Sequence, residues 1–409
     1  MRVTTLLRRM IGVTELFVEA VLFTVHEDVS VSVRPRWRLP RCGKCHRPAP
    51  GYDRRPLRRW EHLCLGRTRI VLSYAPRRVH CRRCGVRVER VPWADGSSRF
   101  TLAFEELVAY LAQITDKTKV TELTGIAWAT VGSIVDRLVN RRLDPARFEG
   151  LRLIGVDEFS YRKRHRYLTV VVDHERRRVV WAGEGRSAEV LGEFFAQIGE
   201  QGRAAIESVT IDMAAGYRKA IREWLPHAEI VYDRFHVQRL ASDAVDEVRR
   251  AMVRELEGTD EAQTVKNTRY ALLKNPWHLT DSEHSRLADI QGTNERLYRA
   301  YLLKEALAQA LDYHQPWRAR KALRAWLAWA SRSKLKPFVK LARTVRRHFD
   351  GILAYVQTRL TNGLVEGLNN KLRMIARRAY GFHSAGALAG MLFLVCGGIE
   401  INPPLPTRS

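Results

Sequence analysis

The sequence predicts a multidomain α+β protein, and three observations support this fold class. The chain has 409 residues, and at about 150 residues per domain it has room for two to three domains rather than one small binding module. Hydrophobic residues are 45% and charged residues 28% of the composition, the balance of a globular protein that can bury a core. The hydrophobic periodicity also changes along the chain, from helical to β-like after residue 150 and back to helical after residue 240.

The charge of the chain is strongly positive. Lys and Arg number 70 against 44 Asp and Glu, which gives a formal net charge of +26. Because such an excess opposes compaction unless a polyanion is the partner, nucleic acid is the first candidate and an anionic membrane the second. The apolar stretch 385–399 has only about fifteen residues, fewer than the roughly 20 that span a bilayer. Glu15 and Glu19 interrupt the apolar N-terminal run, so we expect no targeting segment, no membrane partner and a cytoplasmic location.

Residues 1–35 are expected to form an N-terminal segment and residues 36–95 a cysteine-bearing domain. Two C-x-x-C pairs separated by 35 residues supply four thiols there, from Cys42, Cys45, Cys81 and Cys84. This spacing is typical of a four-thiolate Zn²⁺ ribbon, in which short β-hairpins present the ligands. The alternative, a redox dithiol, needs a βαβ context that is missing here. Between residues 34 and 90, 18 basic residues face three acids, so this zinc ribbon is also expected to bind DNA.

Helical periodicity covers residues 98–146, which are predicted to form three helices. Thr124-Gly125 is expected to make a tight turn before the third helix. That helix has an apolar stripe at i, i+3, i+4 and i+7 spacing, formed by Val131, Ile134, Val135 and Leu138. The layout is that of a helix-turn-helix, although an ordinary helical hairpin gives the same pattern. In a helix-turn-helix, the face away from the stripe would meet phosphates or base edges through Ser133, Arg137 and Asn140.

Residues 150–239 are predicted to form the first part of an α/β domain. Five strands are expected at 151–156, 167–172, 178–182, 206–211 and 229–232, with helices at 188–198 and 217–224. The order β-β-β-α-β-α-β is that of an RNase H-like sheet, in which the first and fourth strands are parallel neighbours. An all-helical insertion is predicted at residues 240–358, and residues 359–402 are expected to complete the domain.

Two carboxylates follow strands that this topology brings together. Asp157 and Asp212 would lie at the ends of the first and fourth strands and face one cleft. Glu366 supplies a third carboxylate, on a helix after the insertion. Carboxylate oxygens are the ligands that Mg²⁺ prefers, and metal ions held there can support phosphoryl displacement. The polar face of the Glu366 helix could meet a DNA backbone through Asn370, Arg373 and Arg377, although a solvated helix face has the same pattern.

With these motifs in place, the sequence resembles the bacterial insertion-sequence transposases of the ISL-three (ISL3) family, which have a DDE catalytic domain. The resemblance covers nearly the whole chain, and the matching stretches are residues 154–158, 209–213 followed by 216–217, 231–237, 361–371 and 379–382. It implies an enzyme that recognises terminal inverted repeats and performs metal-dependent DNA cleavage and strand transfer. It further implies Mg²⁺ or Mn²⁺ as cofactor, double-stranded DNA as partner, a nucleoid-associated location, and a homodimer or larger assembly on DNA.

Carried over by position, the triad would be Asp157, Asp212 and Glu366. The second acid is open to an alternative, because Asp233 also ends a strand within a matching motif. We favour Asp212, since the fifth strand lies one further from the first. Asp233 and His236 would then position the metal ligands or DNA, or Asp233 would cap the following helix.

Two further expectations concern packing. Cys64 and Cys396 lack a second cysteine nearby and are expected to be packed thiols. The insertion contains four tryptophans among basic residues, for which core packing is favoured over stacking on unpaired bases: Trp277, Trp317, Trp326 and Trp329.

Two other functions share part of this pattern. A DNA-binding regulator with an inactive nuclease fold explains the basic N-terminal half, but gives no reason for three acids in one cleft. A repair nuclease shares the chemistry and differs in substrate. Mg²⁺-dependent nicking would exclude the first, and strand transfer into a second DNA would exclude the second.

Overall fold

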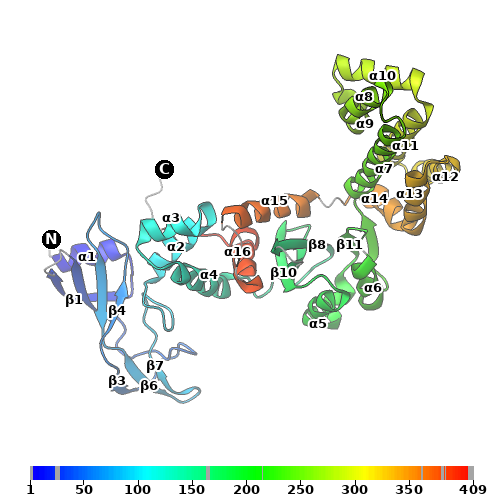
Figure 1. The fold of residues 1–409 in the computed structure, drawn as a ribbon. Coiled ribbons are helices and arrows are strands. Elements are labelled where there is room, and N and C mark those ends of the chain that lie inside the picture. Colours follow the sequence, from blue (N-terminus) through cyan, green and yellow to red (C-terminus); the bar gives the residue numbers. More distant parts are fainter. Residues whose placement is uncertain are drawn as a thin grey trace. The chain divides into compact units, whose positions relative to one another are not determined.

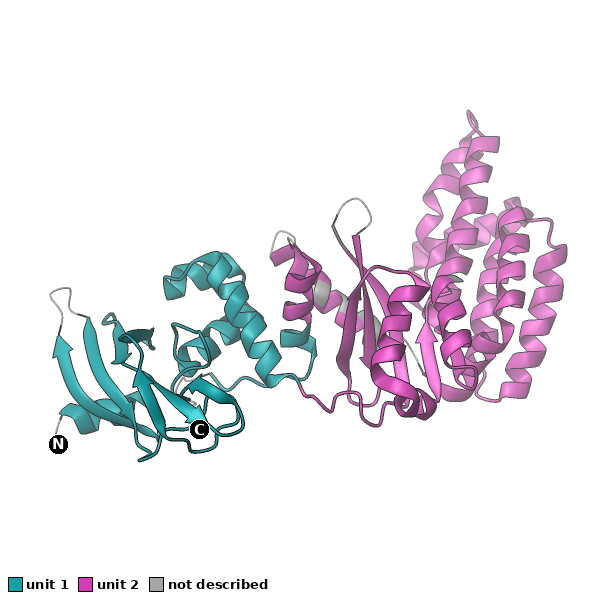
Figure 2. Ribbon diagram, turned by 90° about the horizontal axis from the view of Figure 1, so that it is seen from below, with its two compact units in different colours: residues 1–143, 393–409 teal, residues 144–392 magenta. Residues whose placement is uncertain are grey.

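The computed structural model describes residues 3–23, 28–162, 166–213, 215–360, 363–378, 382 and 384–403. At positions 161, 162, 215, 364–366, 369 and 372 it describes the backbone alone. The chain divides into two compact units, one formed by residues 1–143 with 393–409 and the other by residues 144–392 (Figure 2).

The first unit begins with a four-stranded sheet that the sequence did not predict. After helix α1 (Val3–Ile11), strands β1 (Leu16–Phe23) and β2 (Val29–Pro35) pair, and β2 continues in parallel to β5 (Ile70–Tyr74), which pairs with β4 (Arg58–Glu61). One face is buried around Trp60 and Trp93, whose rings meet edge to face at 5.6 Å. The predicted division at residue 35 therefore runs through a single sheet.

The second pair of cysteines lies on a separate small sheet. Strands β3 (Gly51–Arg54), β6 (Arg77–Cys81) and β7 (Gly85–Val88) are antiparallel in the order β3-β6-β7 (Figure 1). The β6–β7 hairpin carries the second C-x-x-C pair, with Cys81 at the end of β6 and Cys84 in the turn. This hairpin agrees with the arrangement expected of a ribbon.

Three helices follow, as predicted: α2 (Leu102–Ile114), α3 (Lys117–Thr124) and α4 (Trp128–Arg142). Gly125 ends α3 with a φ of 72°, a left-handed conformation that glycine adopts without the steric cost of a Cβ atom. The predicted stripe of α4 is buried, and α4 packs on α2 and α3. The Glu105 carboxylate of α2 is fully buried and accepts hydrogen bonds from Ser98 Oγ and from the guanidinium groups of Arg137 and Arg141.

The second unit contains the predicted five-stranded sheet. Its order is β10-β9-β8-β11-β12, with β11 parallel to both neighbours. The strands are β8 (Leu153–Arg162), β9 (Arg166–Asp173), β10 (Arg178–Glu184), β11 (Ser208–Ile211) and β12 (Glu229–Tyr232). Helices α5 (Ala188–Ala205), which is interrupted at Gly199, and α6 (Ala215–Trp224) lie between them in sequence. The predicted order is thus confirmed.

The first strand of this sheet is longer than predicted. We expected it to end at residue 156, but β8 continues to Arg162 because it forms a hairpin with β9. Its parallel neighbour β11 stops at Ile211. Asp157 therefore lies inside a strand, beyond the point where β11 ends.

Helices fill the rest of the second unit. Those after β12 are α7 (Arg234–Glu255), α8 (Asp260–Asn267), α9 (Arg269–Leu273), the short 3₁₀ helix η1 (Pro276–His278), α10 (Asp281–Thr293), α11 (Glu295–Asp312), α12 (Pro316–Arg332), α13 (Lys336–Arg347), α14 (Phe349–Thr358), α15 (Gly363–Arg378) and α16 (Ala385–Cys396). None of the helices in the described part of the chain is long and apolar enough to cross a membrane.

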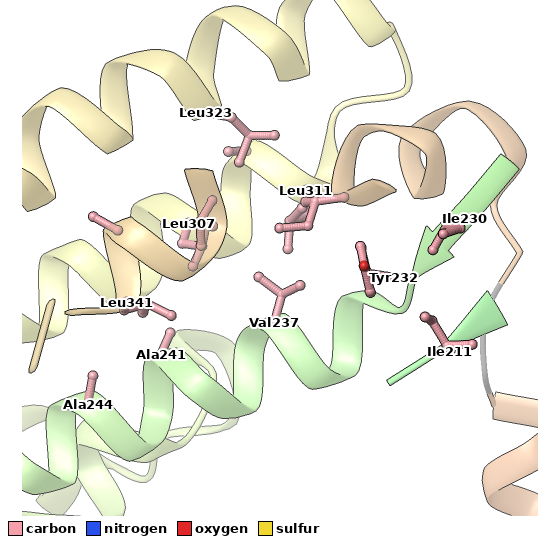
Figure 3. Close-up of a cluster of buried hydrophobic side chains, with 14 of the residues drawn as sticks. Ile211, Ile230, Tyr232, Val237, Ala241, Ala244, Leu307, Leu311, Leu323 and Leu341 are labelled. Carbon is pink, nitrogen blue, oxygen red and sulfur yellow. The ribbon is translucent and has the colours of Figure 1, made fainter. Parts of the chain in front are cut away.

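The sheet and the helical insertion share one hydrophobic core. Figure 3 shows Tyr232 of the sheet close to Val237 of α7, with Ile211 of the sheet on the far side of Tyr232. The same core extends from Val237 to Leu311 and Leu341 of the helical insertion. The predicted boundary near residue 240 falls inside α7. The insertion is therefore packed continuously onto the edge of the sheet.

Four of the six packing expectations were wrong. Trp326 is buried, but Trp277, Trp317 and Trp329 are 69%, 63% and 38% exposed, because they lie on the outer faces of their helices. Cys64 is exposed rather than packed, whereas Cys396 is buried as expected.

The buried carboxylate of Glu105 generates a stability prediction. Glu105→Ala removes the acidic partner of Arg137 and leaves Arg141 with the exposed Asp95 at 3.5 Å, so we expect the free energy of unfolding to fall by about 2 kcal/mol. This is below the usual value for a buried pair because both arginines are partly exposed. Glu122→Ala removes an exposed pair with Lys119 and should cost less than about 0.5 kcal/mol. Denaturant titration of both variants measures this, and equal losses would contradict the assignment.

Candidate active site

The acids of the second unit are aligned by the register of three parallel strands. Thr210 of β11 pairs with Gly155 of β8, so two residues further on Asp212 comes level with Asp157. Ile211 pairs with Tyr232 of β12, which brings Asp233 to the same level. Adjacent strands are about 4.8 Å apart. The structure thus places the predicted pair in neighbouring positions at one edge of the sheet.

The surroundings of Asp212 differ from those of Asp233. The Asp212 side chain is 49% exposed, and His236 Nδ1 lies 3.5 Å from its Oδ1 atom. Asp233 is only 4% exposed and its carboxylate caps α7, accepting the Phe235 amide at 3.2 Å. Asp233 therefore caps the following helix, which was one of the roles considered for it from the sequence. Asp212 remains accessible to solvent beside Asp157.

Negative charge accumulates around the two accessible acids. Burial raises the pKa of the Glu158 carboxyl, and the charges of Asp157 and Asp212 raise it further against the opposing effect of Arg186. Burial also raises the pKa of Tyr217 to about 12, with further contributions from Glu158 and Asp157. Carboxylates that disfavour ionisation of their neighbours form a suitable ligand set for a divalent cation.

A polar layer beneath these acids was not predicted. Tyr217 Oη lies 2.9 Å from Thr169 Oγ1, which donates to the Gly185 carbonyl oxygen at 2.7 Å. Arg186 stacks over the Tyr167 ring at 4.2 Å. The only signal for Tyr217 was its place just after the Asp212 motif. Arg186 gave none, because its position depends on the loop between β10 and α5.

Helix α15, which carries Glu366, lies against β8, the strand of Asp157. The predicted faces agree where side chains are described: Leu368 and Ile375 are buried, whereas Asn370 and Arg373 are exposed, with Arg373 donating to Asn370 Oδ1 at 3.2 Å. Arg377 is also exposed. The side chains of Glu366, Leu364 and Leu372 lie outside the described part of the structure.

The helix-turn-helix candidates divide into two groups. Ser133 and Asn140 are exposed on α4, and the Ser133 hydroxyl donates to the Ala129 carbonyl oxygen. Arg137 instead holds the buried Glu105 carboxylate at 2.7 Å. Any contact that Arg137 makes with DNA would have to coexist with this ion pair.

The four predicted zinc ligands converge in the first unit. Their sulfur atoms all lie within 4.8 Å of one another, and Cys45 Sγ is 3.5 Å from Cys81 Sγ. Tetrahedral Zn–S bonds of about 2.3 Å require sulfurs about 3.8 Å apart, so the donor set fits a zinc ion. Gly43 packs so closely that a Cβ atom would come 2.5 Å from the Val88 carbonyl oxygen.

Comparisons with known proteins agree with this geometry. Residues 154–391 match a family model described as transposase, of the DDE type of family ISL3, and residues 89–139 match the helix-turn-helix domain of transposase family ISL3. The chain belongs to the ISL3 transposase family. This confirms the resemblance inferred from the sequence.

Curated relatives extend the similarity along the chain. The transposase is 40% identical over 407 residues to the transposase for insertion sequence element IS1557 of Mycobacterium tuberculosis, covering 93% of this chain and 90% of the relative. It is 31% identical over 357 residues to the transposase for insertion sequence element IS1001 of Bordetella parapertussis, covering 87% and 88%. The similarity to these two transposases therefore covers most of this chain and most of each relative.

The cysteine cluster generates a metal prediction. We expect the purified transposase to contain about one zinc ion per chain, and Cys81→Ser to reduce this content at least tenfold because zinc requires the fourth thiolate for a closed site. Cys64→Ser, which removes the exposed thiol, should retain the full content. Elemental analysis after dialysis measures both, and zinc retained by Cys81→Ser would contradict the site.

Proposed function

We propose that this ISL3 transposase binds the terminal inverted repeats of an insertion sequence and performs metal-dependent strand cleavage and strand transfer. The observation that carries the proposal is the strand register, which sets Asp157 and Asp212 side by side in a DDE domain. Water breaks a phosphodiester at the element end, leaving a 3′-hydroxyl and a 5′-phosphate. That 3′-hydroxyl then attacks a target phosphodiester, forming a new bond and releasing a target 3′-hydroxyl.

In this proposal Asp157, Asp212 and Glu366 hold Mg²⁺ or Mn²⁺. When bound, the cations would offset the charge that develops on the attacking and leaving oxygens. His236 orients the Asp212 carboxylate from 3.5 Å, and Asp233 fixes the first turn of α7, from which His236 projects. The first step hydrolyses a phosphodiester bond, and the second replaces one phosphodiester bond by another. Neither step therefore consumes ATP.

DNA recognition is assigned to several elements. Ser133 and Asn140 of α4 are accessible for contact with bases or phosphates, with Arg137 as a further candidate. Exposed Asn370, Arg373 and Arg377 on α15 would contact the backbone of the DNA being cut. The zinc-bearing sheet adds positive charge. We also propose action as a homodimer or larger assembly, on DNA of the cytoplasmic nucleoid.

The catalytic assignment generates the next prediction. Asp157→Asn and Asp212→Asn should each reduce Mg²⁺-dependent nicking of element-end DNA at least 10³-fold, because a neutral amide is a poor ligand for a hard cation. Asp233→Asn should keep activity within about tenfold, since asparagine also caps helices well. Gel assays of nicking and separate measurements of DNA binding distinguish lost chemistry from lost affinity.

Three outcomes would contradict these assignments. Nicking that survives Asp157→Asn would remove Asp157 from the triad. A greater loss in Asp233→Asn than in Asp212→Asn would exchange the two roles. Cleavage without any joining to a second DNA molecule would favour a nuclease over a transposase.

A further inference from the structure

Positive charge is segregated within the helical insertion. Residues 240–312 contain 10 Lys and Arg against 13 Asp and Glu. Residues 314–349 contain no acid and the following eleven basic residues: Arg318, Arg320, Lys321, Arg324, Arg332, Lys334, Lys336, Lys340, Arg343, Arg346 and Arg347. The whole excess of the insertion therefore lies on α12, α13 and the turn between them, which we call the α12–α13 surface.

The lack of acidic partners among the described residues distinguishes these cations from most others in the insertion. All eleven are exposed, and none forms an ion pair with an acid in the described part of the chain. By contrast, most cations of residues 240–312 are paired with acids, as in Arg249 with Asp246 and Arg296 with Glu255. Repulsion within the α12–α13 surface is thus uncompensated by the protein itself.

On α13 the cations form a regular stripe. Lys336, Lys340, Arg343 and Arg347 follow i, i+4, i+7 and i+11 spacing, opposite the buried Phe338. At 100° per residue they lie within about 60° around the helix and extend over about 16 Å along it. This length corresponds to about five phosphates of one DNA strand, at 3.4 Å each along the axis.

Three cations of this stripe, Lys336, Lys340 and Arg343, also line a pocket. The pocket has a volume of about 320 Å³ and is lined by Lys334, Lys336, Val339, Lys340 and Arg343. Lys334 and Lys336 lie at the N-terminal end of α13, where a positive charge opposes the helix dipole. Helix stability therefore does not explain these lysines, whereas an anion in the pocket would.

We propose that the α12–α13 surface binds the phosphate backbone of duplex DNA, with one phosphate in the pocket beside Lys336, Lys340 and Arg343. The proposal rests on the proposed function in that DNA is the polyanion the enzyme meets. It adds a binding surface remote in sequence from the helix-turn-helix. Trp317, on the outer face of α12, provides an exposed ring beside Arg318 of the same surface.

The surface belongs to the same compact unit as the acids. Helix α13 packs on α7, and α12 and α13 pack on α14, which lies against β12. DNA held by the insertion would therefore be bound by a body whose core continues into the sheet of Asp157 and Asp212.

The test uses the full-length protein and a random-sequence 40-base-pair duplex, with affinity measured by fluorescence anisotropy at several salt concentrations. The variant K336A/K340A/R343A should weaken binding at least tenfold at about 0.1 M salt. It should also lower the slope of log affinity against log salt by about 2 to 3, since each phosphate contact contributes about 0.9.

Two controls make the result specific. K336R/K340R/R343K keeps the charge and should bind like the parent protein. R254A/K266A/R286A removes three exposed cations elsewhere in the insertion and should leave the salt slope unchanged within about 0.5. An unchanged slope in K336A/K340A/R343A, or an equal loss in the control, would overturn the proposal. Because the catalytic acids are intact in all these variants, this outcome is independent of the nicking results for Asp157→Asn.

Discussion

The parallel pairing of β8, β11 and β12 is the constraint on which the rest of the second unit depends. Its register brings Asp157, Asp212 and Asp233 to one level, although 54 residues lie between the first two. A shift of one residue would turn every side chain of a strand to the opposite face of the sheet. The buried residues on both faces of β11 oppose such a shift, so the core that stabilises the sheet also fixes the carboxylates.

The same core determines how the insertion is attached. Tyr232 of β12 contacts the His348 ring at 4.7 Å, and Gly351 of α14 is so close that a Cβ atom would lie 2.5 Å from the Tyr232 ring. Only glycine permits this approach between helix and strand. The insertion is therefore a packed continuation of the sheet rather than a lobe on a flexible linker, which is why its predicted boundary at residue 240 fell within a helix.

Local periodicity allowed much of this architecture to be predicted. The strand order and the three helices before the sheet follow from patterns within short stretches. The convergence of Cys42 with Cys81 follows from the need of a zinc ion for four thiolates. The N-terminal sheet was missed because β2 and β5 pair in parallel across 34 intervening residues. Composition could not show that Trp317 lies on the exposed face of α12 or that Arg137 reaches Glu105. Those outcomes depend on which helix face meets a neighbour, and Glu366 remains a prediction at the level of its side chain.

Helix α7 links the candidate active site to the helical insertion. Its 22 residues form a rod about 33 Å long, with Asp233 and His236 at one end and the bundle packed along the remainder. Packing fixes the whole rod, because Val237 near its beginning lies in the same core as the sheet and the helix packs on α11 and α13. The 3.5 Å spacing between His236 and Asp212 therefore depends on packing along the whole helix and not on contacts at its first turn alone.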